Sequence, residues 1–278
     1  MREPLISIVI PTKNSSVTLL NCLQSIKDQD YENYEVIIVD MFSTDNTREV
    51  AESFGAKYMA ASNRVPGNRN LGFSKANGSI FVSIDSDMIL SENVLGEIAS
   101  SMESYDALIL PEIGIGSDFI SRCKDLEKRC YLEDGLTESA RAFRRDVFES
   151  VGGFDPNIHF GEDHDIHSRI KSRFSVGRIN ARIMHDVRHT SLLKDLKKAY
   201  VYGHSLRYYL AKKNEHSRRW LSFSNIFFIR HFWKLAKEPI EGMGITMIRL
   251  LEYSAGFLGY VSSYAFPAKG GSKKEDGK

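Results

Sequence analysis

The sequence lacks several features that mark common protein classes. Its three cysteines, Cys22, Cys123 and Cys130, have neither a metal-binding spacing nor the even number that a disulfide framework needs. A reducing compartment is therefore expected. The chain shows no internal repeat, and a strand pattern begins directly after residues 1–4, which leaves no room for a secretion signal. We expect a cytoplasmic protein.

The chain as a whole also lacks a large excess of either charge, because its net charge at pH 7 is only +1. This total hides a split between two parts of the chain. Up to His189 there are 21 Lys and Arg against 29 Asp and Glu, whereas from Thr190 onward there are 16 against 7. Aromatic residues are also dense in the basic part. We expect the C-terminal part to meet an anionic surface.

Apolar runs alternate with helical patterns over the first 110 residues. Strands are expected at residues 5–10, 34–40, 57–61, 78–88 and 107–110, and helices at residues 16–28, 43–53, 68–72 and 92–102. This alternation predicts an α/β fold with a mostly parallel, Rossmann-like sheet and flanking helices. Beyond residue 110 the pattern weakens, with helices expected at 117–132, 145–150 and 161–171 and short strands near 140, 176 and 183.

The stretch from Gly78 to Met88 is a β-branched apolar run that ends in Asp85 and Asp87. Ligands of parallel α/β sheets bind beyond the carboxyl ends of the strands. Because side chains alternate along extended chain, both carboxylates are expected to face the same side. Their oxygens suit Mg²⁺ or Mn²⁺. The structural alternative is an aspartate that caps the following helix near Ser91.

Several short motifs occur in a fixed order along residues 5–200. This series resembles the family 2 glycosyltransferases, which have the GT-A fold. The residues that carry the resemblance are Pro11-Thr12-Lys13-Asn14, Val39-Asp40, Ser43-Thr44-Asp45-Asn46-Thr47, Arg69-Asn70-x-Gly72, Asp85-Ser86-Asp87, Gly152-Gly153-Phe154-Asp155 and Gly161-Glu162-Asp163.

The resemblance implies a binding site for a nucleotide-diphosphate sugar. In it, Asp40 accepts a hydrogen bond from the base or ribose, and Arg69 lies beside the donor. Asp45 has the alternative of a helix cap, and Arg69 that of a solvated helix residue. The residues that match the family's donor site are Pro11, Thr12, Asn14, Asp40, Asp45, Arg69, Asp85 and Ser86.

The resemblance also implies a metal site and a catalytic base. Asp87 and His185 would hold Mn²⁺ or Mg²⁺, with His189 as a weaker candidate and a structural histidine as the alternative. Asp163 would take the proton of the acceptor hydroxyl. The alternative is that Asp163 merely occupies the first turn of a helix, where the helix dipole favours carboxylates.

The C-terminal part has its own pattern. A long helix is expected at 191–213 and a basic, aromatic, amphipathic segment at 220–237. The apolar stretch 245–266 carries Arg249 and Glu252, so an interfacial or packed helix is expected rather than a membrane span. Three regions are expected: a GT-A catalytic domain at 1–190, a helical region at 191–268 and a disordered tail at 269–278.

These observations predict a metal-dependent, inverting glycosyltransferase. It would transfer a sugar from a nucleotide diphosphate to a hydroxyl of a glycan or lipid-linked acceptor, on the cytoplasmic face of a membrane, with no nucleic-acid partner. One rival is a sugar-phosphate nucleotidyltransferase, although the chain lacks a Gly-rich, basic N-terminal phosphate loop. The other is a non-catalytic membrane adaptor. The C-terminal helices could instead fold back onto the catalytic domain.

Overall fold

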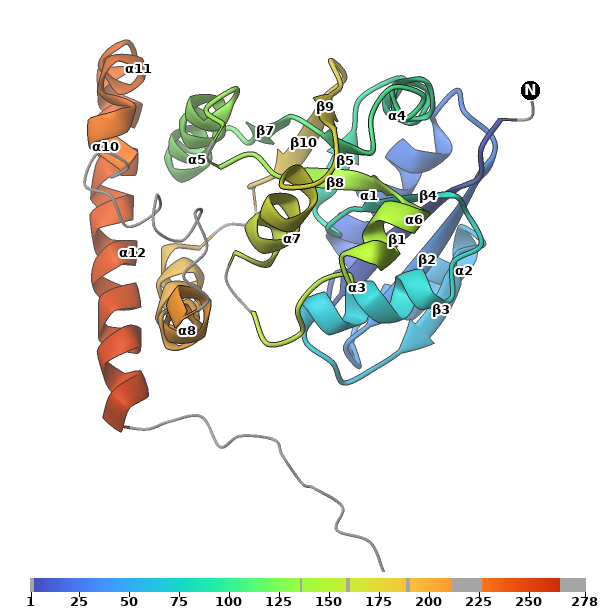
Figure 1. Cartoon of the computed structure of the whole chain (residues 1–278). Helices are drawn as coiled ribbons and strands as arrows, with labels where there is room; N and C mark the ends of the chain where they lie inside the picture. Colours follow the sequence, from blue (N-terminus) through green and yellow to red (C-terminus); the bar gives the residue numbers. More distant parts are fainter. Residues whose placement is uncertain (1–2, 136, 159–160, 189–190, 212–226, 266–278) are drawn as a thin grey trace, which may run out of the picture.

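The computed structural model describes residues 3–135, 137–158, 161–188, 191–211 and 227–265. A seven-stranded sheet has the order β3-β2-β1-β4-β8-β6-β9, with helices on both of its faces (Figure 1). The strands are β1 (Ile6–Thr12), β2 (Tyr34–Asp40), β3 (Lys57–Ala60), β4 (Ile80–Ser83), β6 (Ala107–Ile109), β8 (Ala140–Arg144) and β9 (Val176–Arg178). The flanking helices are α1 (Ser16–Lys27), α2 (Thr47–Ser53), α3 (Val65–Ser74), α4 (Val94–Ser101), α6 (Arg145–Ser150) and α7 (Glu162–Lys171).

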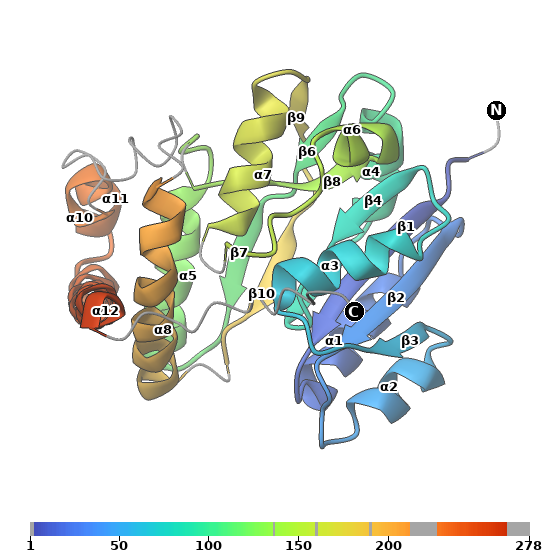
Figure 2. The ribbon, with the colours of Figure 1, turned by 60° about the horizontal axis from the view of Figure 1, so that its bottom comes forward.

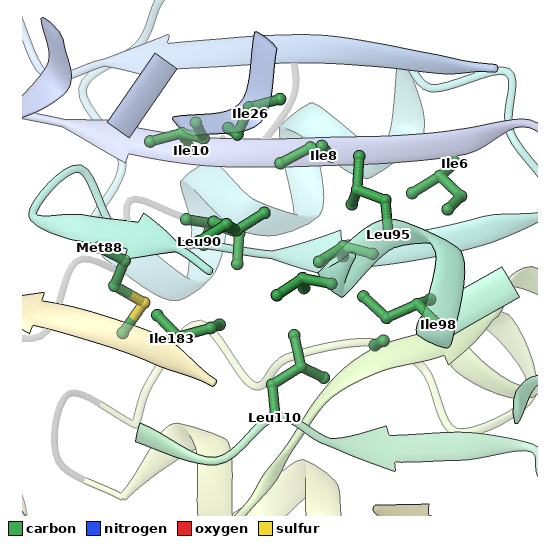
Figure 3. Packing of buried hydrophobic residues seen from close by; sticks show 14 of the residues in the cluster. Ile6, Ile8, Ile10, Ile26, Met88, Leu90, Leu95, Ile98, Leu110 and Ile183 are labelled. Atoms are coloured by element: carbon green, nitrogen blue, oxygen red, sulfur yellow. The ribbon is translucent and has the colours of Figure 1, made fainter. Parts of the chain in front are cut away.

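Both faces of the central strands are buried. Alternate residues of β1 point to opposite sides, so Ile8 packs toward α1 and α4 while Val9 packs toward α3. Figure 3 shows the first of these clusters, in which the isoleucines of β1 meet Ile26, Leu95 and Ile98. On the other face, a Cβ at Gly72 would lie 2.4 Å from a methyl group of Val9, so only glycine allows α3 this close to the sheet. The predicted α/β class is confirmed.

The strand predicted across residues 78–88 is in fact two strands. β4 ends at Ser83, a turn closes when the Met88 amide donates to the Asp85 carbonyl, and β5 (Met88–Leu90) follows. β5 belongs to a second sheet of order β5-β10-β7, with β10 (Ile183–Asp186) and β7 (Glu112–Ile115). The two aspartates therefore lie in a turn between two sheets rather than along one strand.

The parallel pattern also stops at β4. β8 runs antiparallel to both β4 and β6, which separates the parallel half of the sheet from the parallel pair β6 and β9. β7 was not predicted, because a four-residue strand around Gly114 has little periodicity to detect. These two differences matter for the site, because β8 and β7 deliver charged residues to it.

The remaining helices form a layer beside the sheet (Figures 1 and 2). They are α5 (Phe119–Tyr131), α8 (Leu192–Ala211), α10 (Phe227–Arg230), α11 (Phe232–Ala236) and α12 (Pro239–Ala265). A separate apolar cluster joins Cys123 and Leu126 of α5 to Phe227, Leu235 and Ile245. The predicted boundary at 190/191 stays a prediction, and α5 shares a core with helices beyond it. Residues 212–226 and 269–278 lie outside the described residues.

α12 turns its charges toward the protein. Glu252 is buried and accepts a 2.6 Å bond from Lys124, while Arg249 contacts Glu252 at 2.8 Å and also pairs with Glu127 of α5. The opposite face of the helix is apolar. It exposes Ile240, Met243, Met247, Leu250, Leu251, Leu258, Val261 and Tyr264. No helix in the described part of the chain combines the length and hydropathy that a bilayer crossing requires.

Candidate active site

Most of the predicted site residues gather at one end of the central sheet. Pro11 and Thr12 close β1, and Thr12 lies opposite Asp40 at the end of β2. The turn 85–87 follows β4, and Ser86 is half-buried within it. Asp163 lies in the first turn of α7. The structure thus places the motif residues at the edge where parallel α/β sheets bind ligands. His189 lies outside the described residues.

Asp40 organises the part of this edge that is predicted to bind the nucleoside. Its carboxylate accepts four bonds from protein donors: the hydroxyls of Thr12, Ser43 and Tyr58, and the Ser43 amide at 2.7 Å. Burial raises the pKa of Asp40, but these hydrogen bonds outweigh it, and the pKa is lowered. A carboxylate has about four acceptor positions, and protein donors take all of them here. The predicted contact with base or ribose stays a prediction.

Asn14 and Asp45 hold the loops beside Asp40. The Asn14 side chain accepts a 2.8 Å bond from the Thr44 amide. Asp45 accepts bonds from the Thr47 amide and hydroxyl and from the Ser16 amide, which ties the starts of α2 and α1 together. Burial raises the pKa of Asp45, but these bonds together outweigh it and lower the pKa to about 2. The N-cap residue of α2 is Asn46, one position after Asp45, and the predicted contact of Asp45 with the donor stays a prediction.

Arg69 lies at the centre of the site and is only 2% exposed. One Nη atom donates to Asp85 at 2.7 Å, and the other donates to Asp163 at 2.8 Å and to Glu162 at 3.2 Å. Its guanidinium also lies 5.2 Å from the ring centroid of Phe154. Arg69 therefore joins the turn after β4 to the first turn of α7, rather than facing outward.

Arg141 of β8 is a second buried cation that sequence analysis missed. Its Nε donates to Glu112 at 2.6 Å, and its Nη atoms lie 3.5 Å from Asp85 and 3.9 Å from Asp163. Burial raises the pKa of Asp85, but the charges of Arg69 and Arg141 outweigh it, and the pKa falls well below its usual range. Two arginines therefore keep Asp85 ionised.

Glu162 and Asp163, at the start of α7, have different surroundings. Burial and the neighbouring charge of Asp163 raise the pKa of Glu162, and Arg69 only partly offsets them. Asp163 is one-quarter exposed and lies between the two arginines. The predicted base is therefore held by cations at an accessible position, and a second carboxyl with a raised pKa lies beside it.

The second sheet brings the predicted metal ligands together. His185 of β10 pairs with Met88 of β5, and the Asp186 amide donates to the Asp87 carbonyl at 2.7 Å. As a result, His185 Nε2 lies 3.1 Å from Asp87 Oδ2, while its Nδ1 lies 3.4 Å from a Glu112 oxygen. Burial and Lys128 lower the pKa of His185, but the bonds to the two carboxylates outweigh them, and the pKa is raised.

The remaining motif residues support this arrangement. Asn70 exchanges two hydrogen bonds with the backbone of Phe154, at 2.7 and 2.9 Å, and so fixes the Gly-Gly-Phe turn beneath Arg69. Buried Asp165 holds Arg169, which donates to the carbonyls of Val151 and Gly153 in the same turn. The motifs therefore include residues whose visible task is to position others.

Sequence signals for the missed residues were weak. Arg141 interrupts an apolar strand pattern, which was a detectable sign of a buried charge, whereas Glu112 had no distinguishing context. Within the described residues, no group of three or more His, Cys, Asp and Glu side chains is arranged to hold a metal ion. A metal ion held by Asp87 and His185 would thus need further ligands, such as phosphate oxygens of the donor or water.

Comparison with known proteins places this architecture in a family. Residues 7–152 match the family described as Glycosyl transferase family 2. A stretch of 114 residues is 34% identical to the glycosyltransferase GlyG of Streptococcus pneumoniae serotype 4, and covers 37% of this chain and 36% of that relative. The chain therefore belongs to glycosyl transferase family 2. The match spans about a third of this relative.

Two solved structures share the fold along most of the chain. The mannosyltransferase PcManGT from Pyrobaculum calidifontis, in complex with GDP-Man and Mn²⁺, superposes with a TM-score of 0.62 and 15% identity over 96% of this chain and 88% of that one. S. aureus TarS 1–349 in complex with UDP-GlcNAc has a TM-score of 0.57 and 16% identity over 94% and 91% of the two chains. The predicted GT-A fold and family are confirmed.

Proposed function

We propose that the protein transfers a sugar, with inversion, from a nucleotide-diphosphate donor to an acceptor hydroxyl, with the help of a divalent cation. One observation carries the proposal: two buried arginines hold Asp85 and Asp163 beside the Asp87–His185 pair. A carboxylate base and a candidate cation site therefore lie at the same end of the sheet. Inversion rests on the family resemblance and is tested by the anomeric configuration of the product.

The residues at the turn 85–87 fit a divalent cation. Asp87 Oδ2 and His185 Nε2 lie 3.1 Å apart, and a carboxylate with an imidazole suits Mn²⁺. Glu112 accepts from the other ring nitrogen of His185, as outer carboxylates of metal-bound histidines do. A bound cation would stabilise the charge of the departing diphosphate. The related mannosyltransferase was solved in complex with Mn²⁺, which supports this assignment.

Asp163 is the proposed base. Its oxygens lie toward Arg69 and Arg141, which favour the ionised carboxylate that must accept the proton of the acceptor hydroxyl. Arg69 and Arg141 act as positioning residues, because they contact the carboxylates and are themselves buried. The accessible side of Asp163 is where an acceptor hydroxyl would approach.

The donor end is proposed at Asp40 and its neighbouring loops. The two structural relatives bind GDP-Man and UDP-GlcNAc, so a nucleotide-diphosphate sugar is the class of donor that the fold supports. Asp40 would act either directly on the nucleoside or by fixing Ser43 and Tyr58, which donate to it. Membership of family 2 argues against a nucleotidyltransferase, and donor hydrolysis with and without Mn²⁺ distinguishes an enzyme from an adaptor.

A thermal-shift panel of UDP and GDP with Mn²⁺ tests the proposal. A nucleotide at about one hundred times its dissociation constant stabilises the folded state by about 2.7 kcal/mol. Asp87→Ala should remove the Mn²⁺-dependent part of this shift and abolish transfer, while the fold survives because Asp87 is 40% exposed. Turnover of Asp87→Ala at the wild-type rate in the presence of chelator would contradict the metal assignment.

We further propose that the outer face of α12 lies on a membrane, which would bring a lipid-linked acceptor close to the site. The support is a row of exposed apolar side chains without a charge among them, with Trp233 of α11 79% exposed nearby. Two cations of the basic segment expected to contact lipid bond to backbone carbonyls of the protein instead. Arg230 donates to the Asp134 carbonyl, and Lys234 donates to the Cys130 carbonyl at 2.8 Å.

A further inference from the structure

Three helices, α5, α8 and α12, line a cavity of about 680 Å³ that is partly open to solvent. This size is typical of cavities that bind small molecules. Its wall changes character along its length. One part is aliphatic and aromatic, with Leu206 of α8 and Phe257 and Tyr260 of α12, and another part carries charged side chains. Such a wall suits a ligand that is apolar at one end and charged at the other.

The two long helices form a close-packed wall beside the cavity. A Cβ at Gly203 would lie 2.0 Å from the Gly256 carbonyl oxygen, and a Cβ at Gly259 would lie 2.0 Å from that of Tyr200. The backbones of α8 and α12 therefore touch at these glycines. Gly256 differs from them, because a Cβ there would meet only the Ala199 oxygen, at an ordinary 3.6 Å. A Cβ atom can thus be added at Gly256 without separating the helices.

Most charged groups in the wall neutralise one another. Lys124 lies 2.6 Å from Glu252 and 3.6 Å from Asp195, and Arg249 is paired with Glu252. Lys198 of α8 is different. Among the described residues no carboxylate forms an ion pair with it, and its Nζ lies 5.5 Å from the ring centroid of Tyr202. It is therefore a cation at the cavity wall that makes no direct ion pair with a described carboxylate.

Lys198 and Tyr202 also connect the cavity with the candidate active site. The pKa of Lys198 is raised, first by Tyr202 and then by the charges of Asp85 and Asp87. Burial raises the pKa of Tyr202, as do the charges of Glu162 and Asp85. Helix α8, which carries both side chains, lies between α12 and α7, whose first turn holds Asp163 (Figures 1 and 2). The order in space is therefore the aromatic wall on α12, Lys198 on α8 and the acidic site.

We infer that this cavity binds the hydrocarbon chain of a lipid-phosphate-linked acceptor, with Lys198 on its phosphate and its terminal sugar hydroxyl directed toward Asp163. The order of the chain, phosphate and sugar in such an acceptor matches the order of the three features in the protein. The inference rests on the proposed glycosyltransferase function and deepens it by naming the acceptor class. Lys198 and Tyr202 are acceptor-positioning residues in this assignment.

Equilibrium binding to the full chain tests the inference, with farnesyl phosphate, farnesol and inorganic phosphate as probes below their aggregation concentrations. Farnesyl phosphate should bind more tightly than either fragment. Gly256→Leu fills the cavity and should abolish binding of both farnesyl compounds. Its matched control is Ser254→Leu, which adds the same side chain at an exposed position of the same helix and should bind like wild type.

Recognition of the phosphate charge is tested separately from binding of the hydrocarbon chain. Lys198→Gln should weaken binding of farnesyl phosphate about tenfold and leave binding of farnesol unchanged. Lys197→Gln, at the adjacent position of α8 that does not line the cavity, should change neither. Unaltered farnesyl phosphate binding in both Gly256→Leu and Lys198→Gln would overturn the inference. If Gly256→Leu misfolds, Ala199→Leu fills the cavity from α8 and decides the question.

Nucleotide binding in the same samples separates the two proposals. If Mn²⁺ and UDP or GDP stabilise the protein but farnesyl phosphate does not bind, the acceptor inference fails alone. If no nucleotide stabilises the protein, the glycosyltransferase proposal fails. Retained nucleotide binding by Gly256→Leu shows that this variant is folded and that the cavity alone was changed.

Discussion

The central sheet and α12 differ in where their charged side chains lie. In the sheet, the apolar faces of β1 and β2 are buried, and charges gather at the exposed end of the strands. In α12, Arg249 and Glu252 point inward, while the apolar side chains, such as Leu250 and Leu258, point to solvent. The apolar faces of the sheet are covered by the flanking helices, whereas the outer apolar face of α12 is not covered by any described residue. Contiguous exposed apolar residues are typical of interaction surfaces, which is why membrane contact is proposed for this face.

The two regions also use their buried charges differently. Arg69 and Arg141 hold carboxylates that remain partly open to solvent at Asp85 and Asp163. Under α12, the pairs of Lys124 and Arg249 with Glu252 join helices to one another. The buried charges of the first region position carboxylates at the candidate site, whereas those of the second region hold α12 against its neighbouring helix. Mutations that remove each kind of charge should therefore have different effects.

The largest expected effect comes from removing the proposed base. Asp163→Asn keeps the shape of the side chain but cannot accept a proton, so turnover should fall by about 10²–10⁴. Nucleotide affinity should stay within a few-fold of wild type. Steady-state kinetics and nucleotide titrations measure the two effects, with Glu162→Gln as the neighbouring control that should retain most of its turnover. Equal losses of nucleotide binding and turnover in Asp163→Asn would show a structural role.

Removal of the central cation should be the next largest effect. Arg69→Met leaves Asp85, Glu162 and Asp163 without their main cation, and broken buried pairs typically cost about 3–5 kcal/mol. The free energy of unfolding, measured with urea, should fall by that order. Arg48→Met, which breaks an exposed pair with Glu52, should change it by only about 0.5 kcal/mol or less. Similar changes in the two variants would be inconsistent with a buried network.

The outer face of α12 is tested by flotation with anionic liposomes. The double variant Leu250→Glu/Leu258→Glu places two charges on the exposed apolar row and should lower the bound fraction at least tenfold, because each apolar contact with lipid is worth on the order of 1.5–3 kcal/mol. Val17→Glu/Leu20→Glu, which changes two exposed apolar residues of α1, is the control and should float like wild type. Flotation of both variants at the wild-type level would argue against membrane contact through α12.

The smallest expected effect is a pH dependence of stability from His185. Its pKa in the folded protein is raised above the ordinary value of 6.5 by Asp87 and Glu112, against the opposing effects of burial and Lys128. The imidazolium therefore stabilises the folded state fully below about pH 6.5, and this contribution is lost as the pH rises through the raised pKa. Urea unfolding with chelator, compared with His185→Gln, should show a stability difference that shrinks from pH 5.5 to 8. A difference independent of pH would contradict the assignment.

Much of the fold followed from local patterns. The apolar runs of β1 and β2 and the helical spacing of α1 were predicted to within a few residues, because a buried strand or helix face repeats over a short window. The motif series also predicted which residues would gather at the sheet edge. The positions of Asp40 and Asp85 there are a direct consequence of strands that end at the same edge, whereas Asp163 arrives in the first turn of α7.

The partners of those residues did not follow from the sequence. Asp85 meets Arg69 from α3 and Arg141 from β8, which are 16 and 56 residues away along the chain. Whether β8 runs parallel or antiparallel decides where Arg141 lies, and no local pattern specifies the pairing of a five-residue strand. Glu112 reaches His185 only because the second sheet joins three short, distant segments.

By itself, the sequence determined the apolar strands, the carboxylates at their ends and the apolar content of α12. The tertiary structure alone decided that two arginines occupy the space between Asp85 and Asp163, and that α12 turns Arg249 and Glu252 inward. Periodicity reports which residues share a face of one element. It does not report which other element that face meets, because that contact depends on chain topology over distances much longer than a helical turn.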